Sequence, residues 1–127
     1  MKSMPAITIC FSLLTFASHS QQAAHAGGDA VRGKQLYATQ CIACHSIEAS
    51  LAGPAHRGVV GRKAGSVADF DYSPALKKSK LIWTEKNLDL WLQNPEQRIP
   101  GQKMGFMVTN AQDRQDLIAW LKTQTAK

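Results

Sequence analysis

The stretch that decides the fold is Cys41-Ile42-Ala43-Cys44-His45, two cysteines three positions apart followed at once by a histidine. In a helical turn, residues three apart lie on one face, so both thiols can reach the two vinyl groups of a single porphyrin. The histidine that follows then lies close enough to the ring centre to place a nitrogen on the iron. The spacing therefore predicts covalent attachment of one haem c, with His45 as an iron ligand.

Three other interpretations of the cysteine pair have to be weighed: a disulfide, a redox pair of the thioredoxin type, and half of a zinc site. A zinc ribbon needs a second ligand pair, and no cysteine lies downstream of Cys44. A thioredoxin-type pair needs a βαβ setting, and no stretch of the sequence alternates convincingly over strand length. The histidine directly after the pair favours the haem site.

Residues 1–26 have the pattern of a secretory signal peptide. Lys2 supplies a short positive region, residues 6–17 form an apolar run, and Ala24-His25-Ala26 is a small-x-small cleavage site. The apolar run is well short of the roughly 20 residues that span a bilayer, so we do not expect a membrane anchor. Cleavage after Ala26 would leave residues 27–127 as a single exported domain without a membrane span, located in the periplasm.

The chain is basic, with 15 Lys and Arg against 9 Asp and Glu and a formal net charge of +6. The basic residues are scattered, and no motif combines them with aromatic side chains, so nucleic acid is not an expected partner. The charge balance favours an acidic protein partner or an anionic surface.

The two ends of the mature chain are predicted to be helical. Asp29 can cap a helix that begins near Ala30 and runs into the cysteine pair, and Asn110 can cap a last helix. The apolar side of that last helix consists of Leu117, Ile118, Trp120 and Leu121.

Between these helices, residues 46–73 show no sustained period and contain several glycines, which indicates a long loop. Such a loop is unusual in a compact domain unless it encloses a prosthetic group. Ser73-Pro74 favours a short helix with proline at its first position, and Thr84 can cap a helix over 85–94. We expect Pro95 to end that helix and a loop to follow, giving an all-α domain of three to five helices.

At this point the chain resembles the soluble, single-haem cytochrome c family of mitochondrial cytochrome c and its bacterial relatives. The resemblance covers nearly all of residues 28–123. Besides the haem motif, it rests on an ordered series of short motifs: Gly53-Pro54, Gly61-Arg62-Lys63-Ala64-Gly65, Tyr72-Ser73, Trp83, Leu92-Gln93-Asn94-Pro95, Ile99-Pro100-Gly101-Gln102-Lys103-Met104, and Asp116-Leu117-Ile118-Ala119-Trp120-Leu121-Lys122. The fold it implies has crossing terminal helices, and loops wrapped around one covalently bound haem.

Three side chains have an atom suited to the second axial position of the iron. We interpret His56 as an ordinary surface or loop histidine, because a lone histidine is rarely a ligand without supporting context. Composition and spacing leave Met104 and Met107 open. The resemblance implies Met104, at the end of the Pro-Gly-x-Lys-Met motif, and leaves Met107 a packing role.

The resemblance also implies roles for residues around the haem and at the helix crossing. The Pro54 carbonyl is expected to accept from the free ring nitrogen of His45. Arg62, Tyr72 and Trp83 match residues that hold a buried haem propionate. Trp91 stands where the family usually has a tyrosine beside the methionine sulfur, and its indole can only donate. At the helix crossing, Gly33 and Tyr37 should meet Leu117 and Trp120.

A haem with histidine and thioether ligands has no open position, which suits electron transfer rather than an enzyme. The resemblance therefore implies a monomeric one-electron carrier. Its partners would be a donor dehydrogenase or cytochrome complex and an acceptor oxidase or reductase. Two alternatives stay open: an electron-transfer subunit bound to a periplasmic dehydrogenase, and a peroxidase-like or gas-binding haem protein. The second would predict no methionine in the Pro-Gly loop.

Overall fold

A computed structural model describes residues 27–126, and the helices begin where capping side chains stand. The elements are α1 (Ala30–Gln40), α2 (Pro74–Lys78), α3 (Glu85–Gln93), α4 (Pro95–Arg98) and α5 (Ala111–Thr123). Asp29 accepts hydrogen bonds from the first turn of α1, and Asn110 does the same for α5. Within residues 27–126, the only β pairing is an isolated bridge between Lys63 and Ile82. The all-α prediction is confirmed.

The expected loop after Pro95 is wrong at its start, because Pro95–Arg98 form the short helix α4. Asn94 caps this short helix by accepting from the main-chain N–H of Gln97 at 3.0 Å. A proline that cannot continue α3 is well suited to the first position of a new helix, where its missing N–H costs nothing.

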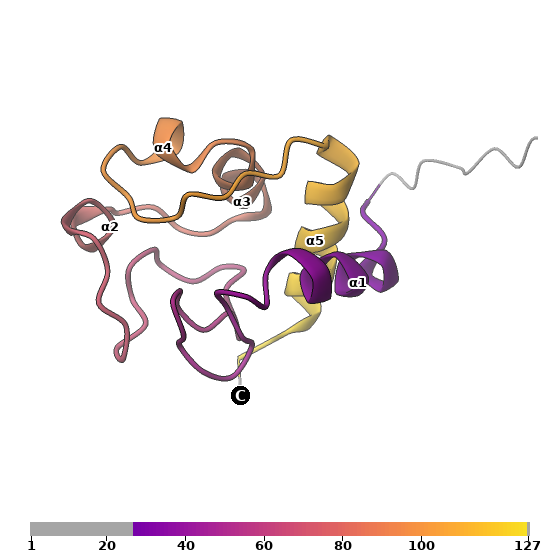
Figure 1. Ribbon diagram of the computed structural model, residues 1–127, viewed down its shortest axis with the longest axis horizontal. Helices are drawn as coiled ribbons and strands as arrows, with labels where there is room; N and C mark the ends of the chain where they lie inside the picture. Colours follow the sequence, from indigo (N-terminus) through magenta and orange to yellow (C-terminus); the bar gives the residue numbers. More distant parts are fainter. Residues whose placement is uncertain (1–26, 127) are drawn as a thin grey trace, which may run out of the picture.

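Figure 1 shows α1 and α5 lying across one another at the end of the molecule away from α2. Gly33 makes this close approach possible, because a Cβ at that position would lie 1.9 Å from the main-chain oxygen of Asp116. One turn later the Tyr37 ring packs on Trp120, with ring centroids 4.4 Å apart. The predicted crossing is therefore present, with the Asp116 backbone rather than Leu117 as the closest neighbour of Gly33.

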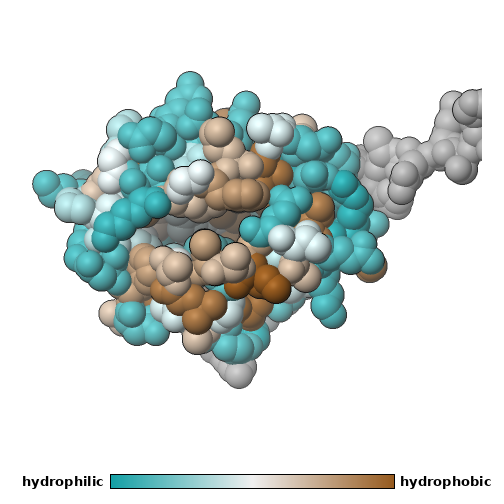
Figure 2. All heavy atoms as spheres, viewed as in Figure 1, coloured by the Kyte–Doolittle hydropathy of each residue, from teal (hydrophilic) through white to brown (hydrophobic). Residues whose placement is uncertain are grey.

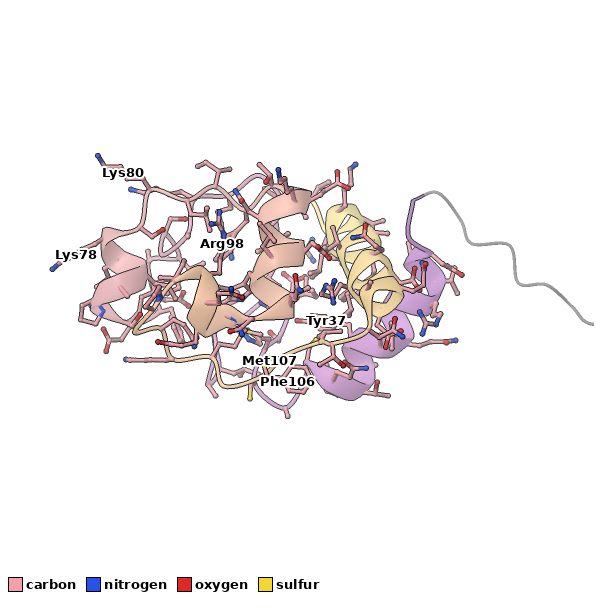
Figure 3. The ribbon with its side chains drawn as sticks, turned by 90° about the horizontal axis from the view of Figure 1, so that it is seen from above. Tyr37, Lys78, Lys80, Arg98, Phe106 and Met107 are labelled. Atoms are coloured by element: carbon pink, nitrogen blue, oxygen red, sulfur yellow. The ribbon has the colours of Figure 1, made fainter. Side chains whose placement is uncertain are left out.

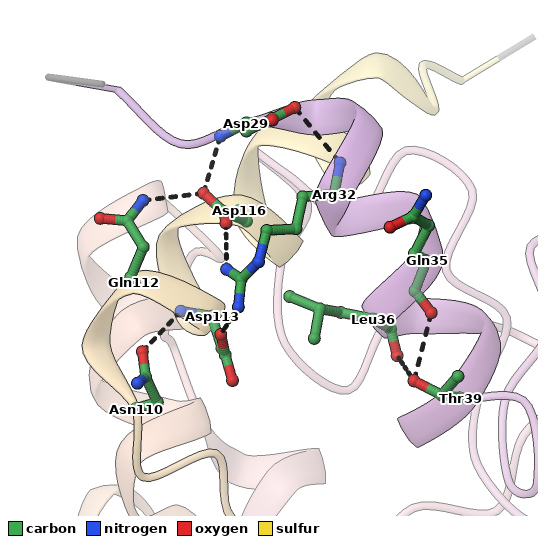
Figure 4. Close-up of polar contacts among 9 residues, drawn as sticks. All are labelled: Asp29, Arg32, Gln35, Leu36, Thr39, Asn110, Gln112, Asp113 and Asp116. Atoms are coloured by element: carbon green, nitrogen blue, oxygen red, sulfur yellow. Dashed lines mark hydrogen bonds and ion pairs between the residues drawn. The ribbon is translucent and has the colours of Figure 1, made fainter. Parts of the chain in front are cut away.

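A buried carboxylate joins the two terminal helices (Figure 4). Asp116 is 1% exposed and accepts from the Asp29 main-chain N–H at 2.7 Å, from Gln112 at 2.8 Å and from Arg32. Arg32 also pairs with Asp113. Burial alone would raise the pKa of Asp116, but these hydrogen bonds outweigh it and hold the pKa below its ordinary value.

The long loop after α1 is held in place by main-chain hydrogen bonds rather than by regular secondary structure. Gly53 donates to the Cys44 carbonyl at 2.7 Å, and His56 donates to Ser46 at 2.9 Å. Further along, Trp83 donates to the Arg62 carbonyl at 2.8 Å. These contacts close the loop across from α3 and α5 (Figure 1), and mostly apolar side chains from both sides line one interior cavity.

Candidate haem site

The interior opens to the surface as a cavity of about 570 Å³. Figure 2 shows the face on which the molecule is hollowed, with hydrophobic side chains gathered along the hollow. All nine residues that the sequence analysis assigned to haem binding line this cavity: Cys41, Cys44, His45, Pro54, Arg62, Tyr72, Trp83, Trp91 and Met104. They come from the end of α1, the long loop, the segment between α2 and α3, α3 itself and the loop before α5, so only the fold brings them together.

The cysteine pair occupies a turn that continues directly from α1. Cys41 donates its main-chain N–H to Tyr37 at 3.0 Å, and the N–H groups of Cys44 and His45 both return to the Cys41 carbonyl, at 3.1 and 2.9 Å. This single turn presents both thiols and the His45 ring to one cavity. Such an arrangement matches two thioether attachments and one iron ligand on the same macrocycle.

The His45 ring is oriented by the Pro54 carbonyl. The distance from His45 Nδ1 to this oxygen is 2.9 Å, and a carbonyl can only accept, so Nδ1 carries the proton. Burial lowers the pKa of His45, and the bond to Pro54 opposes that shift only in part. The ring is therefore a neutral imidazole whose Nε2 lone pair is available to a metal.

Gly53 makes room for this ring. A Cβ on Gly53 would lie 2.1 Å from His45 Cε1 and 2.5 Å from Nδ1, closer than any real contact. The preference for glycine here comes from space, since the His45 ring occupies the place of a side chain.

The interpretation of His56 as a surface or loop histidine is correct for the loop and wrong for the surface. The residue does lie in the loop, but its ring lines the cavity and stacks on His45, with centroids 4.0 Å apart and planes 20° from parallel. Its Nδ1 shares a hydrogen bond with the Tyr37 hydroxyl at 3.1 Å. A ring packed against His45 cannot reach the opposite side of an iron bound to His45, so His56 is not a candidate for that position.

The two methionines differ in where their side chains lie. Met104 is partly buried and lines the cavity, whereas Met107 is 51% exposed and is not part of the cavity wall. Figure 3 shows Met107 beside Phe106 at the edge of the molecule. The geometry therefore favours Met104 as the methionine able to face a metal held by His45.

Arg62 has a buried polar atom that no protein group satisfies. Its two terminal nitrogens donate to the carbonyls of Arg57 and Ala55 at 2.7 and 2.8 Å, while its Nε is buried without a hydrogen-bond partner. A buried donor left unpaired in the wall of an apolar cavity is costly unless a bound group accepts from it. A haem propionate is a suitable acceptor, and buried Tyr72 and Trp83 line the same cavity.

Sequence reasoning missed Tyr37 and His56 as parts of this cavity wall. The sequence places Tyr37 at the helix crossing and indicates no partner for its hydroxyl. The available signal was position, because His56 stands two residues after the Pro54 carbonyl that orients His45.

The cavity as a whole fits a haem: it is apolar, has two thiols and an imidazole on one turn, and contains an unpaired donor for a carboxylate. Helices and long loops around such a cavity define a c-type haem protein.

Comparison with known proteins gives the same answer. The family model for cytochrome c matches residues 30–125. Cytochrome c2 from Rhodomicrobium vannielii is 47% identical over 105 residues, covering 80% of this chain and 83% of that protein. Cytochrome c from Tetrahymena pyriformis is 48% identical over 98 residues, covering 76% and 89%. The solved structure of cytochrome cH from Methylobacterium extorquens has a TM-score of 0.72 at 45% identity, covering 76% of this chain and 99% of that one.

The chain belongs to the cytochrome c family. The protein is accordingly an electron carrier with a covalently bound haem c, rather than an enzyme, and it exchanges electrons with redox partners. None of the helices within residues 27–126 has the length and apolar character needed to cross a membrane.

Proposed function

We propose that the protein is a periplasmic one-electron carrier whose haem iron is bound by His45 and Met104. The observation that carries this proposal is that both side chains line the same apolar cavity as the cysteine pair, while Met107 lies outside it. When bound, haem c supplies an iron that alternates between the ferric and ferrous states.

The chain's own residues make this exchange easy to repeat. His45 is held as a neutral ligand by Pro54, and the Met104 thioether would close the remaining axial position, so no ligand has to enter or leave. Buried Trp83, Trp91 and Leu92 exclude water from the cavity wall. The free Nε of Arg62 offers a charged donor to a propionate that would otherwise be buried with its charge uncompensated.

Variants of the two methionines test the ligand assignment. Met104→Ala should open the iron to exogenous ligands such as cyanide, lower the reduction potential, and abolish the methionine-to-iron absorption band of the ferric protein. Met107→Ala is the matched control, since it removes the same thioether from an exposed position three residues away, and it should change none of these. Loss of the band in Met107→Ala with retention in Met104→Ala would reverse the assignment.

Residues 1–26, interpreted as a signal peptide, lie outside the residues that the structure describes. We propose that they direct export and are removed, so that the mature periplasmic protein begins at or near Gly27. Mass spectrometry of the haem-loaded protein from a periplasmic extract measures the N-terminus directly. A haem-loaded product that retains Met1 would contradict this proposal.

We also propose that partners meet the protein at the cavity mouth through few charges and an apolar rim. Lys103 lines the cavity, but its Nζ lies 3.8 Å from Asp71, which also pairs with Lys77 at 2.7 Å. Phe106, at the same mouth, is 44% exposed. Lys78 and Lys80 project from the end of the molecule that carries α2, so these two positive charges lie away from Phe106 (Figure 3).

A further inference from the structure

Nothing in the proposed electron transfer requires a histidine at position 56. A histidine in an apolar wall brings two polar ring atoms that must be satisfied, where an aliphatic side chain would bring none. Its ring nevertheless packs flat against His45, with centroids 4.0 Å apart and an interplanar angle of 20°. His56 therefore contacts the face of the His45 ring, and His45 is the residue proposed to bind the iron.

Tyr37 holds this ring in place from α1. The Tyr37 hydroxyl and His56 Nδ1 share a hydrogen bond of 3.1 Å, and the two rings meet edge to face with centroids 5.7 Å apart. Tyr37 is itself 4% exposed and packed on Trp120 of α5. A continuous set of contacts therefore connects the crossing of the terminal helices to the face of His45.

The hydrogen bond to Pro54 does not by itself fix the plane of the His45 ring. Carbonyl oxygens accept hydrogen bonds over a broad range of directions, so one such bond positions Nδ1 but leaves the ring able to rock about it. A flat ring packed against the imidazole face restricts that remaining motion. The Gly53 backbone closes in on the same ring, where even a Cβ would lie 2.1 Å from His45 Cε1.

We propose that His56 is a positioning residue for the haem ligand: Tyr37 holds the His56 ring against His45 and so sets the orientation of the axial imidazole plane. The inference rests on iron ligation by His45. Orienting partners of a ligating histidine usually act through its second nitrogen, whereas this pair acts on the face of the ring. Holding a ligand in one orientation through both oxidation states favours rapid electron exchange, because less of the site has to rearrange.

A double-mutant cycle on the ferric, haem-loaded protein tests the proposal. The variants are Tyr37→Phe, which removes only the hydroxyl, His56→Leu, which removes the stacked ring, and the double variant. Ile118→Val is the control, because Ile118 is buried in α5 but does not line the cavity, so it lowers stability without touching the ligand. The readouts are the haem methyl proton shifts, the low-spin electron paramagnetic resonance g values, and the midpoint of guanidinium unfolding.

We expect Tyr37→Phe and His56→Leu each to shift the haem methyl resonances and the g values, and Ile118→Val to leave both unchanged. Adding Tyr37→Phe to His56→Leu should shift the spectra no further, since the hydroxyl acts only through His56. Stability should behave in the same coupled way. Tyr37→Phe should lower the unfolding midpoint of the wild type but raise that of His56→Leu, because removing the second of two buried polar partners relieves an unpaired group.

Wild-type spectra in both single variants would overturn the proposal, as would additive spectral shifts in the double variant. A failure of the ligation itself would look different, because the wild-type protein would then lack the low-spin spectrum of a histidine–methionine haem before any variant is made.

Discussion

Replacing Gly33 by alanine tests whether the crossing of the terminal helices is set by backbone contact. The new Cβ would lie 1.9 Å from the Asp116 carbonyl oxygen and 2.9 Å from Trp120 Cβ. Because ordinary contacts are roughly 3.5 Å or longer, α1 and α5 would have to separate by about 1.6 Å. The obstructing atoms belong to a helix backbone, so no rotamer change can relieve the collision.

Two opposing terms decide the sign of the effect. Alanine in a helix interior is favoured over glycine by about 1 kcal/mol. Overpacking a tight contact typically costs about 1–3 kcal/mol, and here the separation also weakens the hydrogen bonds from α1 to Asp116 and the packing of Tyr37 on Trp120. We therefore expect the upper end of that cost and a net loss of about 2 kcal/mol in the free energy of unfolding.

Guanidinium unfolding of the ferric protein, followed by far-ultraviolet circular dichroism, measures this loss. The midpoint should fall by about 0.5–1 M with an unchanged slope. Ala38→Gly, at an exposed position of the same helix, is the control for propensity alone and should cost about 1 kcal/mol. The reasoning fails if Gly33→Ala matches or exceeds the wild type in stability while Ala38→Gly behaves as expected.

Three further predictions concern the haem ligand, the buried carboxylate and the docking face. Gly53→Ala should collide with the His45 ring and lower the free energy of unfolding by about 1–3 kcal/mol, whereas Gly105→Ala, which meets nothing within 4 Å, should be neutral; equal midpoints would refute this. The hydrogen bonds to Asp116 lower its pKa by more than burial raises it. The ionised carboxylate should therefore stabilise the folded protein fully above the unfolded-state pKa of about 3.9, and this stabilisation should be lost as the pH falls below that value. Asp116→Asn should accordingly lose less stability than the wild type on acid titration, and parallel curves would contradict the assignment. Oxidation by a mitochondrial-type oxidase with an acidic docking site should be slow and only weakly salt-dependent in stopped-flow experiments, since local charge sets the encounter rate; a fast rate that falls steeply with salt would show that the rim still steers.

The elements that the sequence determined by itself are those whose stabilising contacts are local. Each long helix begins at a side chain that caps an N–H within three residues, as at Asp29, Thr84 and Asn110. The haem motif is equally local, because one turn carries both thiols and the imidazole. Pro95 marks the limit of such signals: the proline that ends one helix also begins another, and only the Asn94 cap distinguishes that case from a loop.

What only the tertiary structure decided lies in the long loops, where no periodicity fixes the direction of a side chain. His56 packs on the His45 ring, and its Nδ1 shares a hydrogen bond with Tyr37, 19 residues earlier in the chain. Met104 and Met107 have the same chemistry and nearly the same place in the sequence, yet one lines the cavity and the other faces solvent. Each of these outcomes depends on packing between segments distant in sequence, and such packing leaves no trace in local composition or spacing.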